Sequence, residues 1–214
     1  MAIQNEKYYL WSDPIAIKKV VNLVHADSII LSTTDTVLGL LAPLSQSARS
    51  CLDTIKKRQA KPYIVLLRSK DRLDHFIEPI ENFHIENLVH SCWPGPLTLL
   101  FKAKRSVPTF ITGSVGTIAI RVPDHAGLQA VLAQCDGLFS TSANLSDQPV
   151  PHTLAEVDPT IIDAVACIID EDNRMAHHSV ASTILDCSHG DIRVVREGAY
   201  PIEKLQTIAG IQFS

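Results

Sequence analysis

Several motifs that mark large classes of proteins are missing from this sequence. The five cysteines are odd in number and the nearest two are 20 positions apart, so neither a C-x-x-C metal site nor a compact disulfide framework is indicated. The nine histidines contain no H-E-x-x-H or similar ligand spacing, and we expect no metal held by the protein itself. The glycine-rich loops G-x-x-x-x-G-K-S/T and G-x-G-x-x-G are absent, as is the G-x-S-x-G nucleophile elbow. Any bound nucleotide must therefore be held by scattered cations and hydroxyls.

Long apolar runs and a surplus of positive charge are also missing. No segment approaches the roughly 20 apolar residues that a membrane span needs, and no basic stretch followed by an apolar core opens the chain. We therefore expect a cytoplasmic protein with no membrane partner. The formal net charge of −4 argues against a protein that coats nucleic acid over its whole surface, although it leaves room for one basic patch.

The length and composition fit one globular domain. The chain has 214 residues, of which 46% are hydrophobic and 20% charged. One-domain α/β proteins reach about 200 to 250 residues, so a second full domain is not expected. We predict a single domain over residues 1–214, with its core at about residues 10–200.

Helical and strand patterns alternate through the first third of the chain. Asp13-Pro14 is typical of a helix start, and apolar residues then recur at helical spacing as far as His25. The patterns that follow predict a strand over residues 28–31, a helix over 47–57 and a strand over 63–67. Strands joined in this way normally run parallel.

The rest of the chain adds two helices and several strands. Helices are predicted over residues 80–92 and 126–134, and two prolines flanking a glycine predict a turn over 93–96. The strand candidates are residues 97–101, 117–122, 137–140, 165–169, 182–186 and 192–195. The predicted fold class is α/β (α+β), a single domain with a twisted, mostly parallel mixed open sheet flanked by helices.

A local excess of positive charge stands out in this acidic chain. Four of the six residues from Lys56 to Lys61 are cations, at the end of the helix predicted over 47–57. Lys and Arg in a last helical turn are favoured by the helix dipole, which is the simpler explanation. The alternative is that these cations form one wall of a binding site for an anion. In that case we expect Arg58 to be indispensable, whereas Lys57, one residue off the face that lines the site, is expected to be replaceable.

Hydroxyl and amide side chains gather after a later strand. Residues 140–146 carry four hydroxyls and one carboxamide directly after Leu138-Phe139. Such groups at a strand exit can donate to phosphate oxygens or to a carboxylate, and strand exits are where open α/β sheets bind ligands. The same residue types also dominate ordinary capped turns, so the segment by itself fits either role.

Two arginines lie on or beside predicted strands. Arg121 should share one face of its strand with Thr117 and Ala119, pointing inward. It then needs an anionic partner, either a structural Asp or Glu or a substrate carboxylate that its planar guanidinium can bind through two hydrogen bonds. Arg196 is a similar candidate at a strand end, with a paired surface arginine as the alternative.

Together these segments resemble the YrdC/TsaC family of threonylcarbamoyl-AMP synthases. The resemblance spans most of the chain and rests on short motifs in a specific order and spacing. The matching segments are Thr34–Leu40 (family P-T-D/E-T-V-Y-G-L), Lys56–Pro62 (K-x-R…K-P), Trp93–Thr98 (W-P-G-P-x-T), Arg121–His125 (R-x-P-x-H), Ser140–Ser146 (S-x-S-A-N-x-S), Ser182-Thr183 (S-T) and Arg193–Gly198 (R-x-G). The chain is similar to the short form of the family, without a further C-terminal domain.

Four positions depart from the family pattern. Thr33 stands where the family usually has proline, Leu38 where it has tyrosine, Gln59 where proline often follows the arginine, and Asp147 where glycine follows the last serine. None of these departures removes a cation or the serine–asparagine pair. Leu38 removes an aromatic hydroxyl from the pocket that the resemblance implies.

The resemblance implies an ATP-dependent nucleotidyltransferase with a YrdC/RibB-like fold and a concave basic cavity. Threonine takes up CO₂ from bicarbonate, and the resulting carbamate attacks the α-phosphorus of ATP and expels pyrophosphate. The product is used for N6-threonylcarbamoyladenosine modification of tRNA, to which downstream transferase proteins carry it. Catalysis of this kind comes chiefly from positioning and from neutralised charge.

The resemblance also implies a role for each matching residue. Lys56 and Arg58 are expected to be catalytic, and replacing Arg58 with Ala is expected to abolish pyrophosphate release while leaving the fold intact. The residues expected to bind ATP, with Mg²⁺ carried by the nucleotide, are Arg58, Lys61, Thr117, Ser142, Asn144 and Arg196. Those expected to bind L-threonine are Thr34, Thr36, Arg121, Ser140 and Ser182. Arg121 is expected to take the threonine carboxylate.

Two other functions stay open at this point. The family's concave cationic surface also suits double-stranded RNA or tRNA, although basic residues are few and an aromatic content of 6% leaves little for base stacking. A paralogue of the YciO type would keep the fold and use another substrate. The intact Ser142-Ala143-Asn144 and Lys56-x-Arg58 argue against that paralogue.

Overall fold

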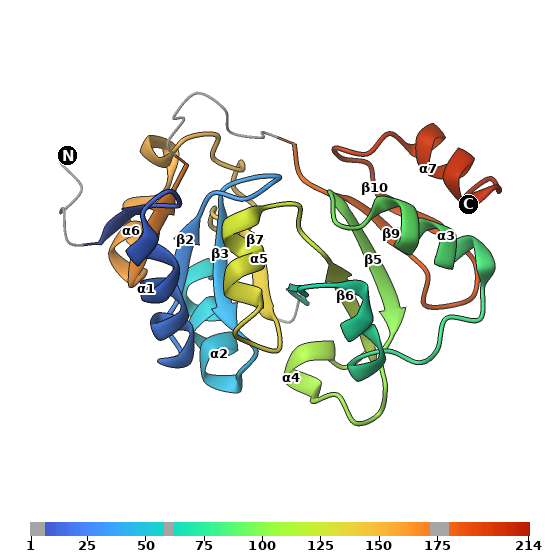
Figure 1. The fold of residues 1–214 in the computed structure, drawn as a ribbon, viewed down its shortest axis with the longest axis horizontal. Helices are drawn as coiled ribbons and strands as arrows, with labels where there is room; N and C mark the ends of the chain where they lie inside the picture. Colours follow the sequence, from blue (N-terminus) through green and yellow to red (C-terminus); the bar gives the residue numbers. More distant parts are fainter. Residues whose placement is uncertain (1–6, 58–61, 172–179) are drawn as a thin grey trace. The chain divides into compact units, whose positions relative to one another are not determined.

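The structure is a computed structural model that describes residues 7–57, 62–171 and 180–214 (Figure 1). It divides into two compact units, the first of residues 1–61 and 125–179 and the second of residues 62–124 and 180–214. Each unit combines strands with helices, which confirms the α/β class. The single domain over residues 1–214 stays a prediction. No helix within the described ranges is long and apolar enough to cross a membrane.

The first unit orders its strands β1-β8-β2-β3-β7. These strands are β1 (Tyr8–Leu10), β8 (Cys167–Asp170), β2 (Ile30–Ser32), β3 (Gly39–Pro43) and β7 (Leu138–Ser142). The helices are α1 (Pro14–His25), α2 (Gln46–Lys56), α5 (Ala126–Leu132) and α6 (Pro159–Ala164), with a 3₁₀ turn η2 (Leu154–Glu156). Strand β8 runs parallel to β1 and β2, whereas β3 runs antiparallel to β2 and β7. Fully buried Val20, Leu40 and Phe139 belong to the core of this unit.

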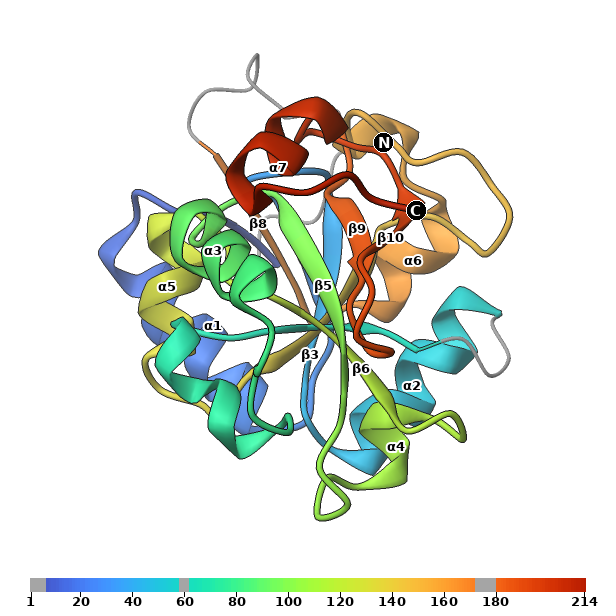
Figure 2. The same cartoon turned by 90° about the vertical axis from the view of Figure 1, so that its right-hand side faces the viewer.

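The second unit orders its strands β4-β6-β5-β9-β10. These strands are β4 (Ile64–Leu66), β6 (Thr117–Arg121), β5 (Leu97–Lys102), β9 (Thr183–Asp186) and β10 (Arg193–Arg196). The helices are α3 (Phe83–Cys92), α4 (Thr109–Thr112) and α7 (Ile202–Ala209), with a 3₁₀ helix η1 (Lys70–His75). Helices α3 and α7 pack against each other (Figure 2). Buried Leu66, Leu97 and Leu205 belong to the core of this unit.

The strand pairing is mixed. Among the described strands, the pairs within the two units comprise four parallel and four antiparallel ones. The predicted mixed sheet flanked by helices is therefore confirmed, whereas a mostly parallel pairing is not seen within the two units. One reason is that residues 33–38 alone join β2 to β3, which is too short for the crossover that a parallel pair needs.

The sequence patterns missed one central strand. All five residues of β3 are buried, so they lack the alternation that marks a strand with one exposed face. The parallel strand-helix-strand unit predicted over residues 28–67 is not formed, because β2 pairs with β8 and β3 while β4 pairs with β6. Elements β1, α4, α6 and α7 were not predicted either.

Local signals fix the helix ends that position the predicted site. The Asp13 carboxylate accepts from the first turn of α1, with Pro14 at its start, and the Ser45 hydroxyl accepts from the first turn of α2. Helix α2 ends at Lys56 and is capped by Lys57, which adopts the left-handed conformation with φ +49°. Because α2 is fixed at both ends, its last residue, Lys56, is held in place.

The turn predicted over residues 93–96 is confirmed. A Cβ at Gly95 would lie 2.6 Å from the backbone oxygen of Cys92, so no side chain fits at this position. The indole nitrogen of Trp93 donates to the Leu97 carbonyl at 2.6 Å. The turn therefore delivers the chain into β5 with a fixed geometry.

Candidate functional site

The ammonium group of Lys56 is at the centre of a hydrogen-bonded cluster in the first unit. The residue is only 2% exposed. Its Nζ donates to the Ser142 carbonyl at 2.7 Å, to the Asn144 carbonyl at 2.5 Å and to Asn144 Oδ1 at 3.2 Å. An ammonium has three donor hydrogens, so these three acceptors are enough to satisfy it. The backbone nitrogen of Ser146 also donates to the Lys56 carbonyl at 3.0 Å. Lys56 thus fastens the segment after β7 to the end of α2.

Side-chain contacts extend this cluster. The Ser142 hydroxyl donates to Asn144 Oδ1 at 2.5 Å, and Asn144 Nδ2 donates to the Gln148 carbonyl at 2.6 Å. The Asn144 amide is therefore held at both its oxygen and its nitrogen. Lys56, Ser142 and Asn144, three of the predicted site residues, are brought together in one network.

The backbone after this cluster explains one departure from the family pattern. Asp147 has φ +63°, in the left-handed region that favours glycine. Aspartate is one of the few other residues that enters this region at modest cost. The turn geometry that glycine would give is therefore kept with a carboxylate in its place.

A second pair of predicted residues follows β2. Thr34 and Thr36 are both buried, and their hydroxyl oxygens lie 3.1 Å apart. Thr34 Oγ1 donates to the Val37 carbonyl at 2.7 Å and accepts from the backbone nitrogen of Thr36 at 3.1 Å. The connection from β2 to β3 is thus folded around the Thr34 hydroxyl.

The two threonines lie near the end of β7. A Cβ at Gly39 would be 3.5 Å from the Thr34 methyl carbon and 3.3 Å from the Thr141 carbonyl oxygen, so the chain segments approach closely there. Gly39 is the register partner of Ser142 in the β3–β7 pair. Ser140 is two residues before Ser142 on β7 and shares its face of the sheet. The first unit therefore brings its other described candidates to one end of β3 and β7, with Ser140 at the middle of β7.

The departures at residues 33 and 38 also have a structural explanation. The backbone nitrogen of Thr33 donates to the Ile169 carbonyl at 3.1 Å, a bond that proline could not make. The Thr33 hydroxyl is buried without a hydrogen-bond partner among the described residues. Leu38 is 3% exposed, so the apolar side chain found there packs in the interior.

In the second unit, Arg196 forms a fork on Ser182. Arg196 Nε and Nη2 donate to the Ser182 carbonyl at 3.2 and 2.8 Å, and Nη2 lies 3.4 Å from the Ser182 hydroxyl. Arg196 is exposed as a whole, but partial burial of its guanidinium lowers its pKa from the ordinary value, because desolvation disfavours the charged form. The Ser182 hydroxyl is also 2.8 Å from Thr98 Oγ1. Two predicted residues are brought together here with Thr98, which lies in the W-P-G-P-x-T motif but was not predicted as a site residue.

The turn after β10 is built on the residue next to Ser182. The Thr183 hydroxyl accepts from the backbone nitrogens of Gly198 at 2.9 Å and Tyr200 at 3.1 Å, and donates to the Tyr200 carbonyl at 2.6 Å. A Cβ at Gly198 would lie 2.1 Å from the Ala181 carbonyl oxygen, so only glycine fits. The S-T and R-x-G motifs are therefore two sides of one packed contact.

The other two candidates of this unit lie at opposite ends of β6. Arg121 is 3% exposed at the last position of the strand, and its carbonyl accepts from the Leu67 nitrogen at 3.0 Å. Thr117 is half-buried at the first position, about 13 Å away along an extended strand. The two side chains lie on the same face of β6, as predicted, but they do not belong to one contact cluster.

His125 has a role that the sequence did not indicate. Its Nδ1 accepts from the Leu128 nitrogen at 3.1 Å and caps α5, and its Nε2 is 2.8 Å from a carboxylate oxygen of Glu171. The Trp11 ring packs against its imidazole with the ring centres 5.1 Å apart. This histidine of the R-x-P-x-H motif therefore begins a helix.

Two predicted cations lie outside the described residues. Arg58 and Lys61, with Gln59, belong to residues 58–61, so their predicted contacts with ATP stay predictions. The described ranges contain no group of three His, Cys, Asp or Glu side chains that could hold a metal ion.

One family model and several known proteins match the chain. A model described as Telomere recombination, for Sua5, YciO and YrdC proteins, matches residues 22–198. A threonylcarbamoyl-AMP synthase of Pyrococcus abyssi is 29% identical over 197 residues, which are 91% of this chain and 57% of that protein. A putative threonylcarbamoyl-AMP synthase of Methanocaldococcus jannaschii is 30% identical over 179 residues, which are 83% of each chain.

A solved structure is also similar. The crystal structure of Pyrococcus abyssi Sua5 complexed with L-threonine has a TM-score of 0.87 and 27% sequence identity, and the match covers 97% of this chain and 62% of that one. The chain thus spans less than two thirds of the Pyrococcus protein but 83% of the Methanocaldococcus one.

Proposed function

The chain belongs to the family of Sua5, YciO and YrdC proteins, which includes threonylcarbamoyl-AMP synthases, and from this premise we propose that it joins ATP, L-threonine and bicarbonate into threonylcarbamoyl-AMP. The threonine nitrogen adds to CO₂ derived from bicarbonate and loses a proton, which gives a carbamate. A carbamate oxygen then bonds to the α-phosphorus of ATP as the bond to the pyrophosphate oxygen breaks. The released product is pyrophosphate.

One observation carries the proposal at the level of this chain. Lys56, Ser142 and Asn144, which the family resemblance picks out from segments 86 or more positions apart, form a single hydrogen-bonded network. A shared network of this kind is expected of a functional site, because the reaction depends on positioned groups rather than on a covalent intermediate.

Lys56, which the resemblance led us to expect as a catalytic residue, is proposed here to serve the reaction as a positioning residue. Its three ammonium hydrogens have protein acceptors at 2.5 to 3.2 Å, so its charge holds the loop of Ser142 and Asn144 in shape. The ATP phosphates would then be met by the loop itself and by other cations. Arg58 and Lys61 are proposed for this part, with Arg58 as the catalytic cation.

The proposed contacts with threonine use a buried arginine and hydroxyls. Arg121 supplies a planar guanidinium that can bind the threonine carboxylate through two parallel hydrogen bonds. The hydroxyl residues proposed for the rest of the amino acid are Thr34, Thr36, Ser140 and Ser182. The relative crystallised with L-threonine supports this choice of substrate.

The remaining proposed contacts are with ATP. Ser142, Asn144 and Arg196 are proposed for its phosphates, and Thr117 for another part of the nucleotide. Mg²⁺ would neutralise phosphate charge and would be held by the nucleotide, since no cluster of protein ligands for it occurs in the described ranges. The proposed location is the cytoplasm, and the proposed partners are tRNA or double-stranded RNA and the transferase that uses the product.

Release of pyrophosphate tests the proposal directly. The purified chain is incubated with ATP and Mg²⁺, and L-threonine and bicarbonate are omitted in turn. We expect release to fall to background on each omission, and L-serine to substitute poorly. Release that ignores threonine would reject the proposal.

The same preparation separates the alternatives. A YciO-type enzyme would leave the tRNA modification missing when expressed in a strain that lacks its synthase, whereas this chain is expected to restore it. An RNA-binding module would bind duplex RNA with an affinity that falls steeply with salt and would release no pyrophosphate.

A further inference from the structure

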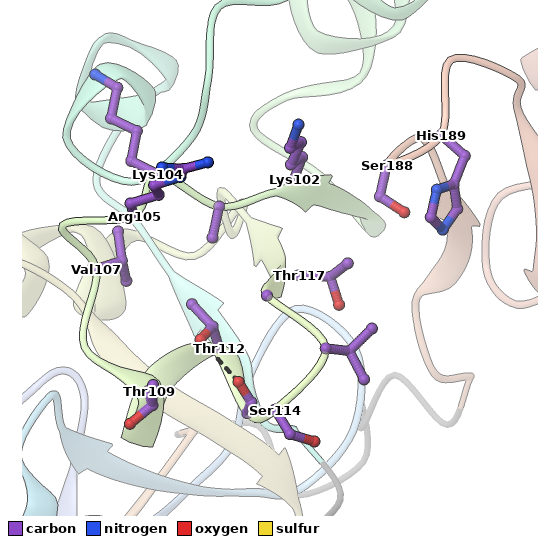
Figure 3. Close-up of a pocket in the computed structure, with 14 residues that line it drawn as sticks. Lys102, Lys104, Arg105, Val107, Thr109, Thr112, Ser114, Thr117, Ser188 and His189 are labelled. Carbon is purple, nitrogen blue, oxygen red and sulfur yellow. Dashed lines mark hydrogen bonds between the residues drawn. The ribbon is translucent and has the colours of Figure 1, made fainter.

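We propose that the second unit carries a binding pocket for a small phosphate-bearing anion. Fourteen residues of that unit line a cavity of about 520 Å³ (Figure 3). Pockets for small ligands typically enclose about 300 to 1,000 Å³. Of the residues with a proposed role, this pocket includes Thr117 alone, so the proposal stands whether or not the synthase reaction is correct.

The pocket lies where three strands begin or end. Lys102 closes β5 and is the register partner of Thr117, which opens β6. Strand β9 runs parallel to β5, and the Cys187 nitrogen donates to the Leu100 carbonyl at 2.9 Å, which brings Ser188 to the same edge. Carboxyl ends of neighbouring parallel strands are the usual ligand-binding edge of open α/β sheets. The position is therefore suited to a ligand.

The lining is positively charged. It contains Lys102, Lys104 and Arg105, and the lining residues that the structure describes include no Asp or Glu. Within the described ranges, Lys102 and Arg105 are exposed and neither takes part in an ion pair. Two exposed cations without a described ion-pair partner line one cavity, and together they attract an anion.

Some polar groups of the lining already donate hydrogen bonds within the protein, so fewer groups are left that could donate to a ligand. Lys104 Nζ donates to the Asp74 carbonyl and points away from the cavity in Figure 3. The Ser188 hydroxyl donates to the Asp186 carboxylate at 2.6 Å, and the Thr112 hydroxyl donates to the Gly113 carbonyl at 3.0 Å. The lining groups left to meet a ligand are Lys102, Arg105, His189 and the hydroxyls of Thr109, Ser114 and Thr117.

This donor set favours phosphate over a nucleoside. Hydroxyls and cations donate to phosphate oxygens, and a guanidinium can do so through two hydrogen bonds. The described lining has no Phe, Tyr or Trp on which a base could stack. A compact anion of two or more charges fits this chemistry, and inorganic pyrophosphate is the simplest probe of it.

Site-resolved binding tests the pocket. Pyrophosphate is titrated into the ¹⁵N-labelled full chain without Mg²⁺, and the amide resonances of Gly113, Ser114 and Gly116 are followed by NMR. We expect saturable shifts in the wild type. We expect at least a tenfold weaker response in the double variant Lys102→Glu/Arg105→Glu. The matched control Lys204→Glu changes the charge of an exposed lysine on α7, outside the lining, and should respond like the wild type.

The outcomes separate the pocket from other anion sites. Shifts confined to residues near Lys56, Ser142 and Asn144 would overturn the pocket while leaving the synthase proposal intact. Equal responses of the wild type and the double variant would also overturn it.

A short RNA duplex is titrated in parallel, because its strands carry the same phosphate chemistry. Shifts of the Gly113, Ser114 and Gly116 amides with RNA and none with pyrophosphate would overturn a small-anion ligand. If the double variant does not fold, absence of these shifts in the wild type alone is decisive.

Discussion

The two units hold their candidate residues by different means. In the first, a buried ammonium with three protein acceptors joins the Ser142 and Asn144 segment to α2. In the second, the Thr183 hydroxyl and the absence of a side chain at Gly198 bring two backbone segments together, and Arg196 forms its fork on Ser182 next to them. Charge therefore shapes the first cluster, whereas close backbone packing shapes the second. A cation near a proposed active site is thus not by itself a ligand for substrate.

The largest effect is expected from Gly198→Ala. A Cβ there would lie 2.1 Å from the Ala181 carbonyl and 2.6 Å from the Ser182 carbonyl carbon, so backbone must move. We expect a loss of about 3 kcal/mol or more in the free energy of unfolding, measured by urea denaturation. Gly39→Ala, where the nearest atom would be 3.3 Å away, is the milder control. Equal, small losses in both variants would show that packing at residue 198 does not hold the second cluster.

Lys56→Met is the corresponding test of the first cluster. It removes the ammonium and leaves the Ser142 and Asn144 carbonyl oxygens without this donor, while Asn144 Oδ1 keeps the Ser142 hydroxyl, so we expect a loss of about 2 kcal/mol in unfolding free energy. Pyrophosphate release should fall as well, because the Ser142–Asn144 loop loses its support. Lys57→Met is the matched control, since Lys57 is exposed and one residue away. Unchanged stability of Lys56→Met would contradict the positioning role.

Most of the difference between the two clusters could not be predicted from the sequence. The motifs placed Lys56, Ser142 and Asn144 in one predicted site, and the three residues share one hydrogen-bonded network, but no pattern shows which acceptors an ammonium will meet after folding. For the same reason Thr98 was missed, although its motif was noticed. Strand β3 was missed because a short run buried on both faces has no alternation to detect. Strands predicted from alternating apolar residues, or from short apolar runs between turn residues, agree with the observed strands to within a few residues.

The reactivity of buried cysteine thiols reports whether the interior of each unit opens to solvent. Burial raises the pKa of Cys167 to about 11 in the first unit. Burial, with a smaller effect from the Asp186 charge, raises that of Cys187 to about 12 in the second. Because the thiolate is the reactive form, both should stay protonated at pH 8 and resist iodoacetamide, whereas exposed Cys51 reacts. Mass mapping checks this, and equally fast labelling of Cys187 and Cys51 would mean that the second unit opens.

The smallest effect, and a gain, is expected from Thr33→Val. The Thr33 hydroxyl is buried without a partner among the described residues, while its backbone bond to Ile169 does not depend on the side chain. Valine has the same shape, so unfolding free energy should rise by about 1 kcal/mol. A thermal melt suffices to measure it. A clear loss of stability would show that this hydroxyl has a partner.

The central claim is that this chain activates threonine as a threonylcarbamoyl adenylate, and isotope incorporation tests it most directly. ATP, L-threonine and ¹³C-bicarbonate are incubated with the wild-type chain, and the adenylate product is identified by mass spectrometry. The account predicts a threonylcarbamoyl-AMP peak that carries one ¹³C atom and disappears when threonine is left out. AMP or ADP as the sole nucleotide product, or an adenylate without the label, would contradict it.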